Sequence, residues 1–382
     1  MLSFGKITSY PKEVIVIKIT SLAWLVSKCI SWKLWLSDRL FPLLPPFEFS
    51  PVLPHFVSAF LFATSLLGLC ALLFFRPNKI IILGVILLEI SSCLLDQMRW
   101  QPWEYQYLLT FVLFLLYKSN TKQFLDLIGF ILIATYIFSG LHKFNGGFLY
   151  TVWDNFILKH ILHLSNTLIA QKGLHYMGLM LSIIELILGL GLLFLKNRKT
   201  VAIFIIIMHL MLLSILGPLG ANHNEVVWPW NMAMIGLVWF LFYEENSSPV
   251  TFFFFKNKLN FSMLVLVGVL PFFNFIGYWD NYLSFNLYSG DVKEVIICVK
   301  NLDKYPELKA FVLKNNPHQY CKDYDALSPN KWSFSELKVP MYAQTRTFYK
   351  LKKEWNRKYP NTDPTFIIYA YPYNEEDAIK IP

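Results

Sequence analysis

Long apolar stretches, separated by short polar connections, fill the first 280 residues of the chain. A helix rises 1.5 Å per residue, so it needs about 20 apolar residues to cross about 30 Å of hydrocarbon. The pattern predicts nine membrane-spanning helices, near residues 14–36, 55–75, 79–95, 104–118, 124–143, 174–195, 200–217, 228–243 and 259–279. Lys18, Lys28 and Lys33 interrupt the first stretch, so a helix lying in the membrane interface is an alternative there.

A shorter amphipathic segment occupies residues 153–170. Its apolar side chains recur at helical spacing, with polar residues between them. It is too polar to cross a membrane, and we expect an interfacial helix on the outer face. His160 and His163 are three residues apart and could both reach a metal ion, but histidines at a headgroup boundary explain them better. We therefore predict no metal site.

The last hundred residues have a different pattern. Runs at 295–299 and 365–369 are typical of strands, and residues 348–358 form a charged helical stretch. The predicted fold is thus an all-α multi-span membrane bundle, residues 1–280, followed by a small α+β extracytoplasmic domain, residues 281–382. We refer to residues 281–382 as the tail.

Composition supports a lipid environment. The 382 residues are 55% hydrophobic and 17% aromatic, and only 15% are charged, against about 25% in soluble domains. So few charges cannot coat a compact soluble body of this size. This composition excludes a soluble enzyme, a disordered chain, a small disulfide-rich secreted domain and a nucleic-acid binder with a basic patch.

The net charge of +9 is unevenly distributed. Four connections, at residues 76–79, 118–122, 196–199 and 256–258, contain nine basic residues, whereas the alternate connections, at 37–54, 96–103, 144–173 and 218–227, contain four in a greater length. Short basic loops stay in the cytoplasm. We therefore place the alternate connections outside, and with them the tail, in a periplasm or lumen.

Cysteines add little chemistry. Cys29, Cys70 and Cys93 fall in apolar stretches and suit small core positions. Cys298 and Cys321 lie in the tail, where an oxidising compartment would permit a disulfide, although their separation does not establish that they face each other. The chain has no CxxC pair.

Polar residues gather at the predicted outer ends of the helices, in four clusters at residues 96–107, 136–145, 222–231 and 279–282. Aromatic belts at membrane boundaries account for the tryptophans but not for His223, Asn224 and Asn231 among them. Because polar groups are expensive in lipid, any chemistry is expected to face outward.

Three ionisable residues inside apolar stretches, Glu89, Glu185 and His209, are expected to form hydrogen bonds within the bundle.

Two of the outer clusters resemble a known family. Leu95-Asp96-Gln97-Met98-Arg99-Trp100 with Tyr105 and Tyr107, and Ser139-Gly140-Leu141-His142-Lys143-Phe144-Asn145, are similar to the vitamin K-dependent γ-carboxylase and its bacterial relatives, the horizontally transferred transmembrane domain proteins. Residues 224–234 and the span around Glu185 are similar too, so the resemblance covers about residues 50–280. It implies a bacterial inner-membrane protein with an outward-facing cavity.

The resemblance also implies residue roles. Lys143 matches the lysine that deprotonates a reduced quinone in that family, and Asp96 and Trp100 match its Asp-x-x-x-Trp loop. Two departures argue against carboxylation of glutamate: Trp103 stands where the carboxylase has histidine, and the tail is much smaller than the family's luminal portion.

Elementary chemistry leaves three possibilities for Lys143. An exposed aliphatic amine, with a pKa of about 10.4, is a poor base near neutral pH, whereas partial desolvation would favour its neutral form and make it useful. A carboxylate such as Asp96, Glu104 or Asp154 would instead keep it charged in an ion pair. The side chain could also simply extend toward lipid headgroups.

Two functions compete at this point. The first is a membrane enzyme that binds a quinone-like, lipid-soluble cosubstrate. Its expected site comprises the catalytic Lys143 and Asp96, and the binding residues Trp100, Trp103, His142, His223, Asn224, Trp228 and Asn231. A bound cofactor cannot be assigned from these residues.

The second is a non-catalytic membrane subunit whose tail docks a secreted or cell-surface protein. Its support is a set of tail aromatics expected to be exposed, namely Tyr320, Trp332, Tyr342 and Tyr349. A quinone-linked redox protein lacks a haem pair or CxxC motif, and a transporter lacks an internal repeat.

Overall fold

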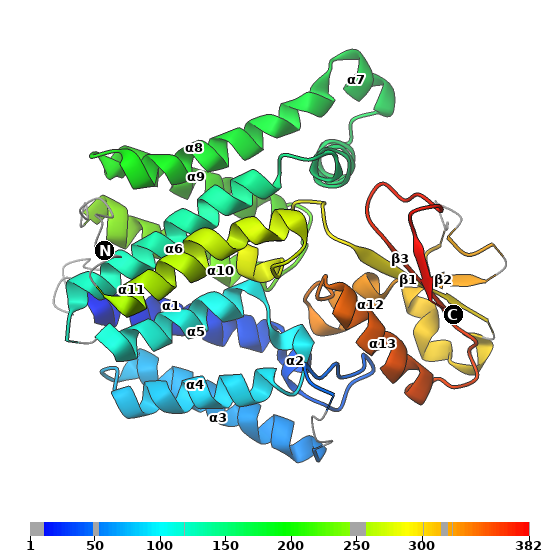
Figure 1. The fold of residues 1–382 in the computed structure, drawn as a ribbon, viewed down its shortest axis with the longest axis horizontal. Helices are drawn as coiled ribbons and strands as arrows, with labels where there is room; N and C mark the ends of the chain where they lie inside the picture. The colour runs from blue at the N-terminus through cyan, green and yellow to red at the C-terminus, as the bar shows by residue number, and fades with distance from the viewer. Residues whose placement is uncertain are drawn as a thin grey trace.

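The structure, a computed structural model, describes residues 11–48, 53–117, 119–244, 257–300, 302–314, 320–322 and 324–381. It is mostly helical, with the long helices side by side and a small sheet at one end of the bundle (Figure 1). Two of the basic residues used to orient the chain, Lys118 and Lys256, lie outside the described residues.

The helices of the bundle follow the predicted stretches closely. They are α1 (Lys12–Ile30), α2 (Trp32–Trp35), α3 (His55–Phe74), α4 (Lys79–Cys93), η2 (Gln97–Arg99), α5 (Pro102–Tyr117), α6 (Thr121–His142), η3 (Phe148–Ile161), α7 (Asn166–Gln171), η4 (Leu174–Met177), α8 (Gly178–Phe194), α9 (Arg198–Leu216), α10 (Val227–Val238), η5 (Trp239–Glu244), α11 (Lys258–Met263), η7 (Leu264–Val269) and η8 (Leu270–Ile276).

Within the described ranges, five helices are long and apolar enough to cross a membrane: His55–Phe74, Thr121–His142, Leu174–Phe194, Arg198–Leu216 and Lys258–Ile276. They coincide with five of the nine predicted positions. Helices α1, α4, α5 and α10 occupy the other four positions and are shorter or more polar. The chain therefore has the helices of a membrane protein.

Helix α6 forms the centre of the bundle. Its most apolar window is 83% buried, against 22% to 33% for the other four spanning helices. It packs closely on α8, since a Cβ added at Gly140 would lie 2.7 Å from the backbone nitrogen of Leu186, and one at Gly189 would lie 2.9 Å from that of Ile137. Small residues at a helix crossing let the two backbones approach in this way.

Helix α1 packs on α3, α5 and α10 and leaves one side, with Leu22 and Val26, exposed. Lys28, one of the charges that interrupt this stretch, forms an ion pair with Glu89 of α4 at 2.7 Å, and neither side chain is exposed. Ser65 of α3 also donates to the Glu89 carboxylate. The predicted interior hydrogen bonding of Glu89 is confirmed, and it explains how α1 accommodates a lysine.

The predicted interfacial helix over 153–170 is divided into two pieces. The first, η3, is a π-helix that begins at Phe148, and α7 begins only at Asn166. Between them His163 adopts the left-handed backbone conformation, with φ 54°, which a continuing helix cannot contain. The prediction of one continuous helix was therefore wrong in its bounds.

The tail contributes an antiparallel sheet with the order β2-β1-β3-β4 among the described residues. The strands are β1 (Glu294–Val299), β2 (Asp325–Leu327), β3 (Thr365–Tyr369) and β4 (Ile379–Ile381), and the tail helices are α12 (Pro329–Leu337) and α13 (Thr345–Lys358). Short helical turns, η9 (Tyr282–Ser284), η10 (Leu302–Lys304) and η11 (Pro306–Phe311), complete it. Both predicted strands and the charged helix are confirmed.

The exposure predicted for the tail aromatics was wrong for three of the four. Trp332 and Tyr342 are at most 1% exposed and Tyr320 is 9% exposed, whereas Tyr349 is half-exposed. Trp332 packs against Phe41 of the segment that follows α2, with ring centroids 4.9 Å apart. These rings are therefore used to build the tail and to join it to the bundle.

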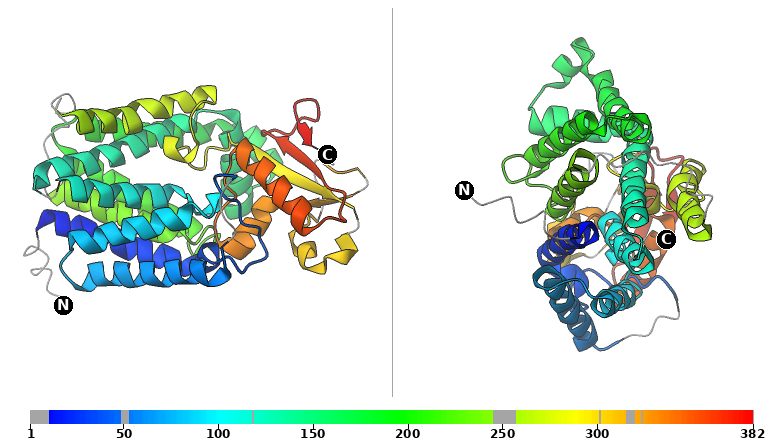
Figure 2. Two further views of the ribbon diagram at one scale, coloured as in Figure 1. Left: turned by 60° about the horizontal axis from the view of Figure 1, so that its bottom comes forward. Right: turned by 90° about the vertical axis from the view of Figure 1, so that its left-hand side faces the viewer.

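The tail is bonded to one end of the bundle (Figure 2). The Glu336 carboxylate accepts hydrogen bonds from the backbone N–H groups of Leu40 and Phe41, at 2.6 and 2.7 Å. Tyr342 donates to Asp280 at 2.8 Å and lies 3.1 Å from the hydroxyl of Tyr105 in α5. One hydrophobic core continues from the bundle into the tail.

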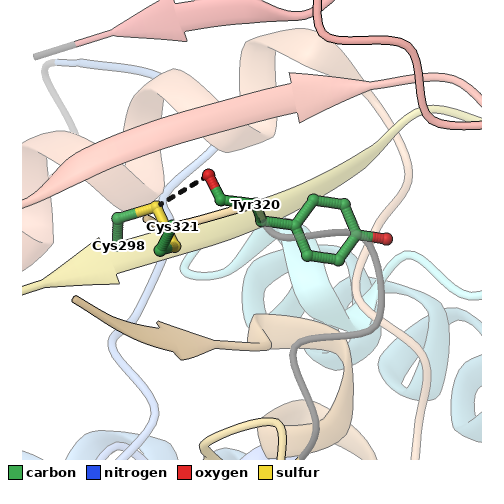
Figure 3. The surroundings of a disulfide bond; sticks show 3 residues. All are labelled: Cys298, Tyr320 and Cys321. Atoms are coloured by element: carbon green, nitrogen blue, oxygen red, sulfur yellow. Dashed lines mark hydrogen bonds between the residues drawn. A yellow bond between two sulfur atoms is a disulfide. The ribbon is translucent and has the colours of Figure 1, made fainter. Parts of the chain in front are cut away.

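Cys298 of β1 and Cys321 form a disulfide (Figure 3). The pairing that their sequence separation left open is therefore made in the structure. The carbonyl oxygen of Tyr320 lies 3.7 Å from Cys298 Sγ. Because a disulfide has no S–H group, this is a packing contact.

Replacing both Cys298 and Cys321 with serine is expected to lower the free energy of unfolding of the tail by about 3 kcal/mol, because the bond closes a loop between residues 23 apart. Thermal unfolding of the full chain in detergent, followed by hydrogen exchange of β1, measures the loss. Cys29→Ser is the control, because Cys29 is free and exposed. Equal stability of the double variant and the control would contradict the expectation.

Candidate functional site

A cavity of about 190 Å³ lies between α6, α8, α9, α10 and η3; we call it the bundle cavity. Most of its walls are apolar. The polar residues that line it include Tyr136, Lys143, Glu185, His209 and Asn231. An apolar cavity with a few converging polar groups is the usual form of a small-molecule site.

Lys143 projects into this cavity from the end of α6. Within the described residues, its Nζ donates to the carbonyl oxygen of Ser139 at 3.1 Å, to Ser139 Oγ at 2.6 Å and to Glu185 Oε2 at 2.6 Å. The Lys143 and Glu185 side chains are only 12% and 16% exposed. Lys143 is thus held in an ion pair inside the protein and does not extend toward lipid headgroups.

The partner of Lys143 differs from those expected. Asp96 pairs with Arg39, Asp154 lies 2.6 Å from His175, and Glu104 accepts from the indole of Trp24 at 2.7 Å. The close crossing of α6 and α8 explains why Glu185 takes this place: Gly140 and Glu185 lie in the crossing, and Lys143 follows one turn later. A lysine at a helix C-terminus is also favoured by the helix dipole and by the free carbonyls of the last turn.

His209 connects two other polar groups of the bundle cavity. Its Nδ1 lies 2.7 Å from Asn231 Oδ1, and its Nε2 lies 2.8 Å from the hydroxyl of Tyr136. Asn231 Nδ2 donates to the Val227 carbonyl, which leaves Oδ1 as an acceptor. In a neutral His209 the proton is therefore on Nδ1, and Tyr136 donates to Nε2. The predicted hydrogen-bonding role of His209 is confirmed.

A second cavity of about 270 Å³, which we call the vestibule, lies between the bundle and the tail. Trp103, His223 and Asn224 line it. It shares several lining residues with the bundle cavity, so the two are neighbours: Val152, Val227, Trp230, Leu287 and Tyr288.

Tyr288 and Asn224 form the boundary between the two cavities. Asn224 Nδ2 donates to the Tyr288 hydroxyl at 2.5 Å. Both residues have left-handed backbone conformations, each with φ 51°. For a tyrosine this conformation is strained, and such strain concentrates at functional sites. Burial raises the pKa of the Tyr288 hydroxyl, which stays protonated near neutral pH.

His223 occupies the vestibule side of this boundary. Its ring lies 4.9 Å from that of Phe334 and 5.4 Å from that of Phe156. Burial, together with repulsion from His160, lowers the pKa of His223. The imidazole is thus favoured in its neutral form among these aromatic rings.

The structure does not bring all the predicted site residues together. Lys143 and Asn231 line the bundle cavity, and Trp103, His223 and Asn224 line the vestibule. Asp96 lines neither cavity. It is fully buried and accepts from the backbone N–H groups of Leu44 and Met98, each at 3.1 Å. The expectation that Asp96 lies with Lys143 was wrong, because Asp96 joins the segment after α2 to the turn that follows α4.

Three other predicted residues also lie outside both cavities. Trp100 stacks on Tyr105, with ring centroids 4.9 Å apart. His142 stacks on Phe275 at 4.3 Å. Trp228 donates to the carbonyls of Leu216 and His223, at 3.0 and 3.3 Å. Their contacts indicate packing roles.

Several residues of the two cavities were not among the predicted site residues, namely Tyr136, Ser139, Glu185 and Tyr288. Ser139 lies one helical turn before Lys143, which is a usable signal. Tyr288 has no such signal, because it comes from the tail and reaches the cavities only through the fold. The part of the chain that the structure describes contains no group of three or more histidine, cysteine, aspartate or glutamate residues placed to hold a metal ion.

Neither models of protein families, nor curated proteins, nor solved structures give a match to this chain.

Proposed function

We propose that this chain is an integral membrane enzyme that binds a lipid-soluble, quinone-like molecule in the bundle cavity and takes a proton from it with the Lys143–Glu185 pair. In this proposal nine helices cross a bacterial inner membrane, because α1, α4, α5 and α10 lie alongside the five long apolar helices. The tail and the vestibule then lie on the extracytoplasmic side, as the distribution of basic loop residues favours.

The observation that carries the proposal is an ion pair facing an apolar cavity. Lys143 and Glu185 are 2.6 Å apart and nearly buried, and hydrophobic side chains surround them. An ammonium group has three protons, and all three are donated here, to Ser139 and Glu185. The lysine can act as a base only after one proton passes to Glu185, so the pair works as a unit.

The cavity has a side suited to entry from the bilayer. Three of its lining residues also face outward: Leu181, Ile184 and Leu212 are 38%, 45% and 38% exposed. Helices α8 and α9 are close at Gly191, where an added Cβ would lie 3.2 Å from Val201. From there α8 continues toward α7 (Figure 1), and it stays packed on α6 near Gly140. A flat apolar molecule would pass between α8 and α9 above this contact.

The proton transfer needs no further group. The hydroxyl of a reduced quinone would lie beside Lys143, which takes its proton after passing one of its own to Glu185. The resulting quinol anion would lie beside the Lys143 ammonium, whose positive charge stabilises it. Deprotonated hydroquinones react with dioxygen more readily than neutral ones, so oxygen uptake provides a measurable outcome.

Binding of a reduced prenylated naphthoquinone to the chain in lipid nanodiscs tests the entry route. Ile184→Trp is expected to weaken binding about ten-fold or more, because the larger side chain fills the space between α8 and α9. Ile187→Trp is the matched control, since Ile187 is on the same helix and 59% exposed but does not line the cavity. Equal binding by both variants would contradict entry of the ligand between α8 and α9.

The competing proposal is a non-catalytic subunit whose tail docks an extracytoplasmic protein. The sequence suggested four exposed tail aromatics as a docking surface. Only Tyr349 of the four is exposed, and Trp332 and Tyr342 are buried, so less supports this proposal. This proposal predicts a stoichiometric partner that co-purifies with the chain and is lost on Tyr349→Ala. It also predicts that Lys143 is dispensable.

A further inference from the structure

A groove of about 920 Å³ lies at the tail end of the bundle, away from both cavities. We call it the outer groove. Its walls are the segment 37–48, the first turns of α3 and one face of α13. Figure 2 shows α13 at this end of the bundle, beside the loop that follows α2.

Basic residues dominate the α13 wall. Lys350, Lys353, Arg357 and Lys358 all line the outer groove. Arg357 is neutralised by Glu354 at 2.6 Å. The three lysines have no carboxylate partner within the described residues, since Lys350 donates to the Pro46 carbonyl and Lys358 to the Leu40 carbonyl.

The orientation of α13 places these lysines in the groove. Its opposite face is fixed in the tail core by Phe348, Leu351 and Trp355, all at most 2% exposed. Burial lowers the pKa of Lys350, as does Arg346, and burial also lowers the pKa of Lys358. Glu48 acts in the opposite direction on Lys350, and Glu336 and Glu307 do so on Lys358, so burial is the main cause of both shifts.

Carboxylates compensate for this charge only in part. Arg39, on the opposite wall, already pairs with Asp96. Asp38 and Glu48 line the groove too, but both are exposed to solvent on the 37–48 segment. Among the residues that line the groove, three lysines without an ion-pair partner therefore face two solvated carboxylates, and the lining keeps a positive surplus. Glu336 and Glu307 act on Lys358 from beyond the lining.

The other end of the groove is apolar and continues onto a membrane helix. Phe47, Leu53 and Pro54 line it next to the start of α3. Beyond them the outer face of α3 exposes Phe56 and Phe60, at 72% and 63%. Since α3 is one of the five spanning helices, this exposed face suits lipid chains.

We propose that the outer groove binds an anionic phospholipid. Lys350, Lys353 and Lys358 hold its headgroup phosphate, and its acyl chains lie along the exposed face of α3. Charge complementarity selects the headgroup, and the continuity of the groove with α3 selects a lipid over a soluble anion. This site is independent of the bundle cavity and of the reaction proposed there.

Native mass spectrometry of the full chain tests the site, with phosphatidylglycerol and phosphatidylcholine as probes. We expect phosphatidylglycerol to bind preferentially. Replacing Lys350, Lys353 and Lys358 together with glutamine should weaken its binding about 100-fold, at about five-fold per lysine. Lys352→Gln is the matched control, because Lys352 is on α13 but does not line the groove.

The single variant Lys353→Gln separates a loss of lipid binding from a loss of folding. Lys353 is exposed and makes no hydrogen bond within the described residues, so its loss should leave thermal unfolding unchanged while weakening binding about five-fold. Equal loss in Lys352→Gln, or equal binding of the two lipids, would overturn the proposal. Retention of inorganic phosphate, with no preference for phosphatidylglycerol, would overturn it too, because the ligand would then be a soluble anion.

Discussion

Lys143→Met is expected to reduce oxygen uptake by the chain, in the presence of a reduced prenylated naphthoquinone, by about 10²–10⁴-fold. This is the range that a positioned general base contributes. Methionine fills a similar volume but can neither accept a proton nor donate to Ser139 and Glu185. Rates are compared in nanodiscs, with each variant at equal folded concentration.

Lys159→Met is the control for loss of one positive charge. Lys159 lies in η3 and donates to Asn155 on the exposed side, away from the cavity. Glu185→Gln should lose nearly as much activity as Lys143→Met, because an amide cannot take the lysine proton. If the two residues work as a unit, the double variant loses no more than either single one. Full activity of Lys143→Met would remove the proposed reaction and favour the docking subunit.

Gly140→Ala should destabilise the crossing of α6 and α8. The added Cβ would lie 2.7 Å from Leu186 N and 3.0 Å from the Ser182 carbonyl oxygen, both backbone atoms. Helix α8 must move away from α6, so we expect a loss of about 1–3 kcal/mol in the free energy of unfolding. The same movement separates Lys143 from Glu185 and should also reduce the oxygen uptake.

Gly84→Ala is the matched control in another helix of the bundle. A Cβ added at Gly84 in α4 meets no described atom within 4 Å. Alanine is the better helix former by about 1 kcal/mol, so Gly84→Ala should be neutral or stabilising. Thermal unfolding in detergent compares the two. A Gly140→Ala variant as stable as Gly84→Ala would show that the α6–α8 crossing is not tightly constrained.

Much of the fold could be predicted from the chain because helix length and apolar pattern follow from local sequence. Helices occupy all nine predicted stretches, and the two predicted strands and the charged helix of the tail lie where expected. The break near His163 could not be predicted, since it depends on one residue's backbone conformation. Burial of Trp332 and Tyr342 depends on how the tail meets the bundle, which no local pattern encodes.

The candidate site could be predicted only in part. Lys143 was identified by its match to the family's lysine and by its place at the end of an apolar stretch, where desolvation would make it a base. Its partner was missed because several carboxylates lie close in sequence, and only the crossing at Gly140 selects Glu185. Asp96 was misplaced for the opposite reason. It shares a sequence cluster with polar neighbours, but its bonds to Arg39 and to two backbone N–H groups tie it to another part of the protein.

The Lys28–Glu89 pair has a consequence for how the protein is made. Lys28 leaves the ribosome 61 residues before Glu89, and an ammonium group without its counter-charge is costly to place in hydrocarbon. Helix α1 is therefore expected to wait at the translocation channel until α4, the third of the nine predicted spans, has been synthesised, and the two should enter the lipid together. Biogenesis of the bundle would then start from this assembled pair.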